Sequence, residues 1–223
     1  GAWALPSVYL HDSALDERTG HIFAVDSLAG TVLEISSAPP LWSGSASVSA
    51  GPRGLPGGAA GWSRSTLTVH RQHRVVAARA ARAAHINGVT FDRRRVWVMH
   101  HNMSRNSEVR AFCRGSETAC AVYALDGPGC HAPLWYRKQL LYLLSATGAI
   151  ALLSPTGKSQ TLWAAGAAFF SKGLAVVDDV AYFGVAEKQA RFDRNKALVE
   201  IVAFDLQQRK LLWRKRTPTP GLV

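Results

Sequence analysis

The feature that most constrains this chain is a short unit that begins with histidine and recurs three times. The copies start at His11, His85 and His131, and each leads into an apolar run, a polar turn and another apolar run. His11 and His85 are 74 positions apart and His85 and His131 are 46 apart, so the first gap fits two units. Repeats of about 40–45 residues built from short strands are typical of a β-propeller, in which blades surround a central channel.

The apolar runs and the turns between them divide the chain into five such units. Alternating apolar residues that flank glycine- and aspartate-bearing turns predict strand hairpins. We therefore predict a single all-β domain over residues 1–223, folded as a five-bladed β-propeller, with four blades and one long insertion as the alternative. The predicted blades span residues 7–37, 50–80, 85–125, 130–166 and 170–216.

The second unit has the weakest pattern, because a stretch rich in glycine, serine and proline interrupts it at residues 43–61. Prolines and glycines at this density favour a long loop over strands. The best strand candidates in this unit are residues 66–70 and 75–78, although the alanine- and arginine-rich residues 75–84 also fit a short helix.

The innermost strand of each propeller blade lines the channel, so the residues that begin each unit should converge there. Aligning the units places three histidines, two cations and an adjacent asparagine at these starts: His11, His85, His131, Arg53, Lys172 and Asn87. Three neutral imidazoles and a water form a typical catalytic zinc site, so His11, His85 and His131 are candidate metal ligands. A divalent metal held there would polarise a carbonyl group or acidify a water molecule.

The same residues allow two other interpretations. Arg53 and Lys172 would repel a metal, but with Asn87 they suit an anionic ligand such as a carboxylate, a phosphate or a sulfate. Alternatively, each histidine only hydrogen-bonds the backbone where its blade begins. The catalytic residues stay unknown, because the sequence has no glycine-rich phosphate loop and no Gly-x-Ser-x-Gly motif, and most of its few carboxylates fall in predicted turns.

A second histidine pair, His100 and His101, follows the predicted strand at residues 96–100. We expect this pair to lie across the strand from the channel, facing solvent or the neighbouring blade. The pair is therefore left out of the candidate site.

The formal net charge is +11, from 26 lysines and arginines against 15 aspartates and glutamates. This balance predicts a basic surface that contacts acidic partners. We do not expect nucleic acid as a partner, because that would require exposed aromatic residues interleaved with the basic ones on one face. No apolar run approaches the roughly 18 residues of a membrane-spanning helix, so we predict no transmembrane segment.

The cysteines bear on the compartment of the protein. Cys113 and Cys120 flank a polar loop, and two strands joined by that loop would bring them close enough for a disulfide. The odd count leaves Cys130 free, or pairs it with Cys120 instead. Asn102-Met103-Ser104 is a sequon for N-glycosylation. Together these features favour a secreted or lumenal protein over one with reduced structural thiols.

Two parts of the sequence resemble plant-type glutaminyl cyclases (glutamine cyclotransferases), a family of five-bladed propellers. Residues 170–174 with 178–182 resemble one blade opening of that family, and residues 86–89 with 95–98 resemble another. The resemblance implies the fold. It does not imply the activity, because the family's acidic residue after the tyrosine of the second inner strand is replaced here by Phe183. By spacing alone, the histidine-led units also resemble metal-binding propellers such as streptogramin lyases.

Two functions follow as hypotheses. The first is a non-catalytic binding or scaffold propeller that engages an acidic protein partner or joins a larger assembly through its basic surface and long loops. The alternative is a metal-dependent lyase, hydrolase or cyclotransferase-like enzyme with a histidine-lined channel. Such an enzyme would hold a divalent metal such as zinc at His11, His85 and His131, and Arg53 and Lys172 would bind a small anionic substrate.

Overall fold

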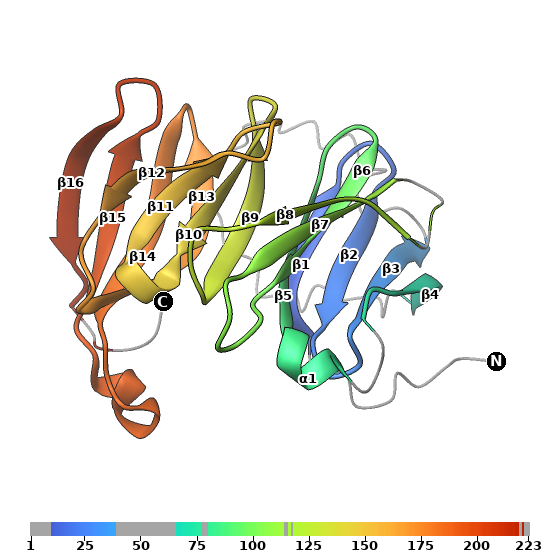
Figure 1. The fold of residues 1–223 in the computed structure, drawn as a ribbon, viewed down its shortest axis with the longest axis horizontal. Helices are drawn as coiled ribbons and strands as arrows, with labels where there is room; N and C mark the ends of the chain where they lie inside the picture. The colour runs from blue at the N-terminus through green and yellow to red at the C-terminus, as the bar shows by residue number, and fades with distance from the viewer. Residues whose placement is uncertain are drawn as a thin grey trace, which may run out of the picture.

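The computed structural model describes residues 10–38, 66–76, 80–113, 116, 118–218 and 220 of the chain. In these residues sixteen strands form four antiparallel sheets of four strands each. The strands of every sheet follow one another in chain order, which is the meander of a propeller blade. Figure 1 shows the four sheets side by side, and we call them blades A to D in chain order.

The N-terminal half contains blades A and B. Blade A consists of β1 (Leu10–Asp16), β2 (His21–Asp26), β3 (Thr31–Ala38) and β4 (Thr66–Arg74). A single-turn helix, α1 (Ala81–Ala84), leads into the second blade. Blade B consists of β5 (Ile86–Phe91), β6 (Arg95–His100), β7 (Glu108–Cys113) and β8 (Ala119–Ala124).

The C-terminal half contains blades C and D. Blade C consists of β9 (Cys130–Tyr136), β10 (Gln139–Leu144), β11 (Ala149–Leu153) and β12 (Ser159–Ala164), with the 3-10 helix η2 (Ser145–Thr147) after β10. Blade D consists of β13 (Phe169–Val177), β14 (Val180–Glu187), β15 (Val199–Asp205) and β16 (Lys210–Arg216), with η3 (Arg191–Lys196) after β14. No helix in the described residues is long and apolar enough to cross a membrane.

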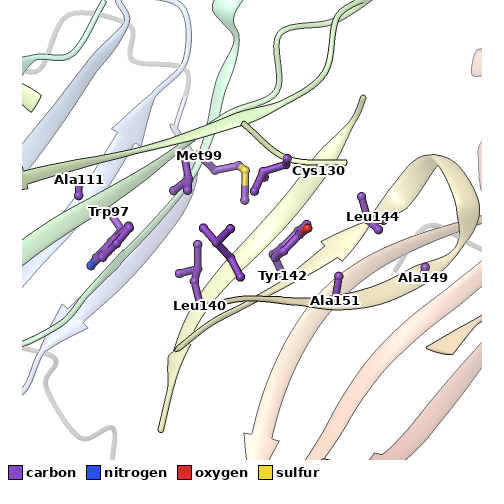
Figure 2. Packing of buried hydrophobic residues seen from close by; sticks show 12 residues of the cluster. Trp97, Met99, Ala111, Cys130, Leu140, Tyr142, Leu144, Ala149 and Ala151 are labelled. Carbon is purple, nitrogen blue, oxygen red and sulfur yellow. The ribbon is translucent and has the colours of Figure 1, made fainter. Parts of the chain in front are cut away.

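Blade C shows how the blades stack. Successive residues of a strand point to opposite faces of its sheet, so a strand buried on both faces must be apolar throughout. In β10, Leu140 and Tyr142 pack against blade B, where Trp97 belongs to the same core (Figure 2). Leu141 and Leu143 point the other way and pack against blade D. The run of five apolar residues in β10 is therefore explained by burial between two neighbours.

A third apolar core joins blades A and B, with Val25 and Ile86 among its fully buried members. The described residues thus form one core between each consecutive pair of blades, and no described core joins blade D back to blade A. Blade D also leaves Val177 57% exposed and Trp213 44% exposed. In Figure 1 the outer strands β4 of blade A and β16 of blade D lie on opposite sides of the view.

The prediction of five blades is wrong, because the described residues form four. The predicted unit at residues 7–37 supplies only three strands of blade A, and the fourth strand comes from the predicted unit at residues 50–80. Ala38 pairs with Thr66 across the interrupted stretch, so the two units complete one four-stranded sheet. The all-β propeller is confirmed, in the four-bladed form that the sequence left as an alternative.

The structure contains the disulfide between Cys113 and Cys120, whose Cα atoms are 5.9 Å apart at the ends of β7 and β8. Cys130 is free and buried. Asn102 of the sequon is only 7% exposed, and its side-chain amide donates a hydrogen bond to the carbonyl of Asn106 at 3.1 Å. N-glycosylation of Asn102 stays a prediction, and the burial of this side chain disfavours it.

Gly88 in β5 sets how closely blades B and C approach. A Cβ at this position would lie 2.3 Å from Cδ of Pro133 in β9, and the proline ring cannot rotate away. We therefore expect Gly88→Ala to lower the free energy of unfolding, measured by urea denaturation, by about 1–3 kcal/mol, as overpacked cores do.

Gly127→Ala is the matched control, because a Cβ there would meet only Leu144 at an ordinary 3.6 Å. Equal losses in the two variants would contradict the steric explanation, since only Gly88 lies against a neighbouring backbone ring.

Candidate functional site

Each inner strand carries a β-bulge at the same end of its blade. The extra residues are His11 in β1, Asn87 in β5 and Gly173 in β13, and β9 has one between His131 and Leu134. A bulge bends its strand and re-aims the side chains beside it. Side chains near all four bulges accordingly line one cavity in the channel.

Four histidines from three blades meet at this end of the channel, and we call them the histidine cluster. The ring centroids of His11 and His85 are 5.1 Å apart, and those of His85 and His101 are 5.5 Å apart. The ring of His131 lies 5.1 Å from that of His101 and 6.2 Å from that of His11. The contacts therefore close a ring of four imidazoles.

The backbone brings His85 and His101 together. Helix α1 ends at Ala84, and His85 caps it with a left-handed backbone, with φ 41° and ψ 70°. Histidine adopts this region more readily than most residues. The carbonyl of His85 accepts a hydrogen bond from the His101 N–H at 3.2 Å, where β5 begins and β6 ends. The two rings meet because antiparallel neighbours begin and end at the same edge of a sheet.

Ser107 and Asn87 join blade B to blade C beside the cluster. Ser107 is fully buried, and its hydroxyl donates to the carbonyl of His101 at 2.9 Å and accepts the N–H of Cys130 at 3.0 Å. The Asn87 amide donates to the carbonyl of Cys130 at 3.0 Å. These bonds fix the backbone immediately before His131 relative to that of His101.

Hydrogen bonds give His131 and His101 opposite roles. Nδ1 of His131 lies 2.9 Å from the carbonyl oxygen of Gly129, which can only accept, so Nδ1 carries the proton and Nε2 keeps a free lone pair. Nδ1 of His101 accepts the N–H of Met103 at 3.1 Å, so its proton is on Nε2. His131 therefore presents an acceptor at Nε2, and His101 presents a donor.

The histidine cluster is uncharged near neutral pH. Burial, with a contribution from His101, lowers the pKa of His131 to about 3, and burial with His85 and His11 nearby lowers the pKa of His101 to about 4. Burial also lowers the pKa values of His11 and His85, and the positive charge of Lys172 adds to the shift in both. Neutral imidazoles can each donate and accept a hydrogen bond.

A cavity of about 410 Å³ opens beside the cluster, a volume typical of small-molecule pockets. Its main polar lining comes from all four inner strands: His11, Asp12, Asn87, His131 and Lys172. Burial raises the pKa of Asp12, whose carboxylate accepts the Val89 N–H at 3.2 Å and so ties blade A to blade B. Oδ1 of Asn87 is buried and has no hydrogen-bond partner in the described part of the chain.

The structure brings five of the six singled-out residues to one place. His11, Asn87, His131 and Lys172 line the cavity, and His85 contacts His11. Arg53, the sixth, lies outside the described residues. The first residues of the four blades are not in strictly equivalent positions. His131 and Lys172 share one register position in their blades. His85 lies one position before that register position in blade B, and His11 lies one position after it in blade A. The histidines converge nevertheless because the bulges bring residues on either side of them to the channel.

The three candidate metal ligands, His11, His85 and His131, fit a metal site in this conformation only in part. The Nδ1–H of His131 is anchored on a carbonyl, and its free Nε2 is typical of a metal-binding histidine. Among the described histidines, cysteines, aspartates and glutamates, however, no group of three is arranged to hold an ion. The positive charge of Lys172 also acts on His11, His85 and His131. A metal at the three histidines stays a hypothesis.

The expectation that His101 lies across the strand from the channel is wrong. β6 is antiparallel to β5, so the end of β6 lies beside the start of β5. Histidines at both ends of this hairpin were the feature of the sequence that could have predicted the position of His101. His100 differs from its neighbour, because it is fully buried and neither ring nitrogen has a hydrogen-bond partner among the described residues. Burial lowers the pKa of His100 to about 3, so it is a neutral core residue.

Comparison with known proteins supports the propeller fold. No protein-family model matches the chain, and no curated protein matches it either. A streptogramin B lyase structure has a TM-score of 0.56 and 8% identity, over 99% of this chain and 72% of that one. Virginiamycin B lyase from Staphylococcus aureus has a TM-score of 0.54 and 8% identity, over 99% and 74%.

A Bacteroides uniformis protein assigned as a 6-phosphogluconolactonase has a TM-score of 0.54 and 10% identity, over 96% of this chain and 57% of that one. Identities this low show a shared fold and nothing finer. The comparisons do not show a relationship to glutaminyl cyclases, so that part of the resemblance is not supported.

The low pKa of His131 predicts acid sensitivity. Its pKa is lower in the folded protein than in the unfolded chain, so the unfolded chain binds the proton first and stability falls as the pH drops below 6.5. Between pH 7.5 and 5 this histidine alone should cost about 2 kcal/mol of unfolding free energy. We expect His131→Asn, whose amide can replace Nδ1–H, to lose about 2 kcal/mol less than wild type over that interval in urea denaturation.

For each protein, the free energy of unfolding at pH 5 is compared with the value for the same protein at pH 7.5. Equal acid losses in wild type and His131→Asn would show that His131 does not resist protonation in the fold.

Proposed function

We propose that this protein binds a small organic anion at the histidine cluster and acts on it by proton transfer. The observation that supports the proposal is a ring of four neutral imidazoles of which two, His11 and His131, line one cavity together with Lys172. An ammonium group attracts a carboxylate or phosphate, and neutral imidazoles supply hydrogen bonds to it.

The residues would divide the work. Lys172 lowers the pKa values of His11, His85 and His131, so it lies within electrostatic reach of all three and can neutralise the bound anion. His101 donates from Nε2 and His131 accepts at Nε2. The negative charge of the bound anion raises the pKa of His131 towards the working pH, where a general base is most effective.

The similar structures agree with this assignment without establishing it. Two are named as lyases and one is assigned as a lactonase, so propellers of this shape are compatible with chemistry on small molecules. Function depends on the site rather than on the fold, so the histidine cluster is what supports the proposed chemistry.

Acetate is the simplest probe of the anion site. We expect acetate to shift the histidine Hε1 NMR signals of wild type in a saturable way, and Lys172→Gln to weaken that binding at least tenfold. Lys158→Gln is the matched control, because Lys158 is an exposed lysine of blade C that does not line the cavity. We also expect the affinity to rise from pH 7.5 to 5.5, because the anion favours the protonated imidazoles.

An unchanged histidine spectrum at high acetate would reject the proposal. In that case the scaffold function would become the stronger hypothesis, since it needs no ligand in the channel. The scaffold function stays a prediction that rests on the basic composition.

A metal site is the second candidate, favoured by the anchored Nδ1 and free Nε2 of His131. It predicts near-stoichiometric zinc in dialysed wild type, measured by elemental analysis, and loss of the metal in His85→Ala. His21→Ala should retain it, because His21 pairs with Glu34 on β3 and does not belong to the cluster. Metal-free wild type would reject this candidate and leave the anion site unaffected.

A further inference from the structure

A second cavity, of about 360 Å³, lies beside the histidine cluster, and His101 is the one residue of its lining that the function proposed above uses. Exposed polar residues at positions 187–189 contribute to its lining. The rest of its wall is mainly apolar and comes from blades B, C and D: Met103, Pro128, Ala146, Phe170, Ala186 and Ala197. We call this cavity the apolar pocket.

The apolar pocket shares its wall with the histidine cluster. His101 lines the pocket, and its ring centroid is 5.1 Å from that of His131. Phe170 also lines the pocket, and its ring meets His131 edge-on with the centroids 5.6 Å apart. A group bound in the pocket would therefore lie against His101 and Phe170, two rings that contact His131 of the anion site.

Gly129 keeps the donor of His101 accessible from the pocket. A Cβ at Gly129 would lie 3.5 Å from Nε2 of His101, so a side chain at this position would cover the Nε2–H. Its φ of +71° is also a conformation that glycine adopts without strain. The pocket therefore combines a mainly apolar wall with the hydrogen-bond donor of His101 and the polar residues at positions 187–189, a combination that suits a ligand with both an apolar and a polar end.

We infer that the apolar pocket binds the apolar end of the same ligand, which is then an organic acid carrying an aromatic or branched aliphatic group. This inference rests on the proposed anion site. The pocket is larger than the roughly 150 Å³ cavity that accommodates benzene in a protein core. The Met103 thioether and the Phe170 ring make favourable contacts with aromatic groups, and three alanines leave room for one.

The test compares 3-phenylpropionate with acetate, which shares the carboxylate but has no group for the pocket. We expect wild type to bind 3-phenylpropionate at least tenfold more tightly than acetate by NMR titration. Ala146→Phe fills the pocket and should remove this advantage, whereas acetate binding stays as in wild type. Ala164→Phe is the matched control, because Ala164 is an exposed alanine of blade C that does not line the pocket.

Met103→Ala is a second test variant. The position tolerates substitution because Met103 is 55% exposed. Loss of its thioether should weaken 3-phenylpropionate binding threefold to tenfold and leave acetate binding unchanged. Acetate binding without any advantage for 3-phenylpropionate would overturn the pocket inference and leave the anion site intact. An advantage that survives in Ala146→Phe would also overturn it, whereas no binding of either acid would refute the anion site itself.

Discussion

The packing of each blade's face on the next is the interaction on which the rest of the structure depends. Five consecutive residues of β10 are apolar because successive side chains such as Leu140 and Leu141 point to different neighbours, and both are buried. The same packing brings the inner strands close enough for Gly88 to touch Pro133 and for Asn87 to reach the backbone of Cys130. Since the histidine cluster takes its members from blades A, B and C, no single blade contains the site, and the site forms only when the blades pack.

Packing also determines the electrostatic character of the cluster. Burial holds His131 and His101 in the neutral form, and neighbouring imidazoles and Lys172 reinforce the effect. Neutral imidazoles beside a lysine favour a bound anion. The negative charge of the anion offsets the positive charge of the lysine, and it lowers the cost of protonating a histidine. The predicted acid sensitivity of the fold and the proposed affinity for anions therefore have one physical origin.

Much of the local structure could be predicted from the sequence. Alternating apolar runs locate most strands, and the cysteine spacing predicts the disulfide at Cys113 and Cys120. The number of blades could not be predicted in the same way. β4 pairs with β3 across residues 39–65, and nothing local in a strand of nine residues indicates which distant strand it will join.

The repeat predicted that residues at the starts of the units, among them His11, His85, His131 and Lys172, would approach the channel, because propeller strands repeat one geometry. Tertiary structure alone decided the rest. His101 joins the cluster because antiparallel pairing places the end of β6 beside the start of β5. The proton positions on His101 and His131 depend on Met103 and on Gly129. Such partners are set by how the backbone folds back on itself, and hydrogen bonds of this kind leave no periodic pattern in a sequence.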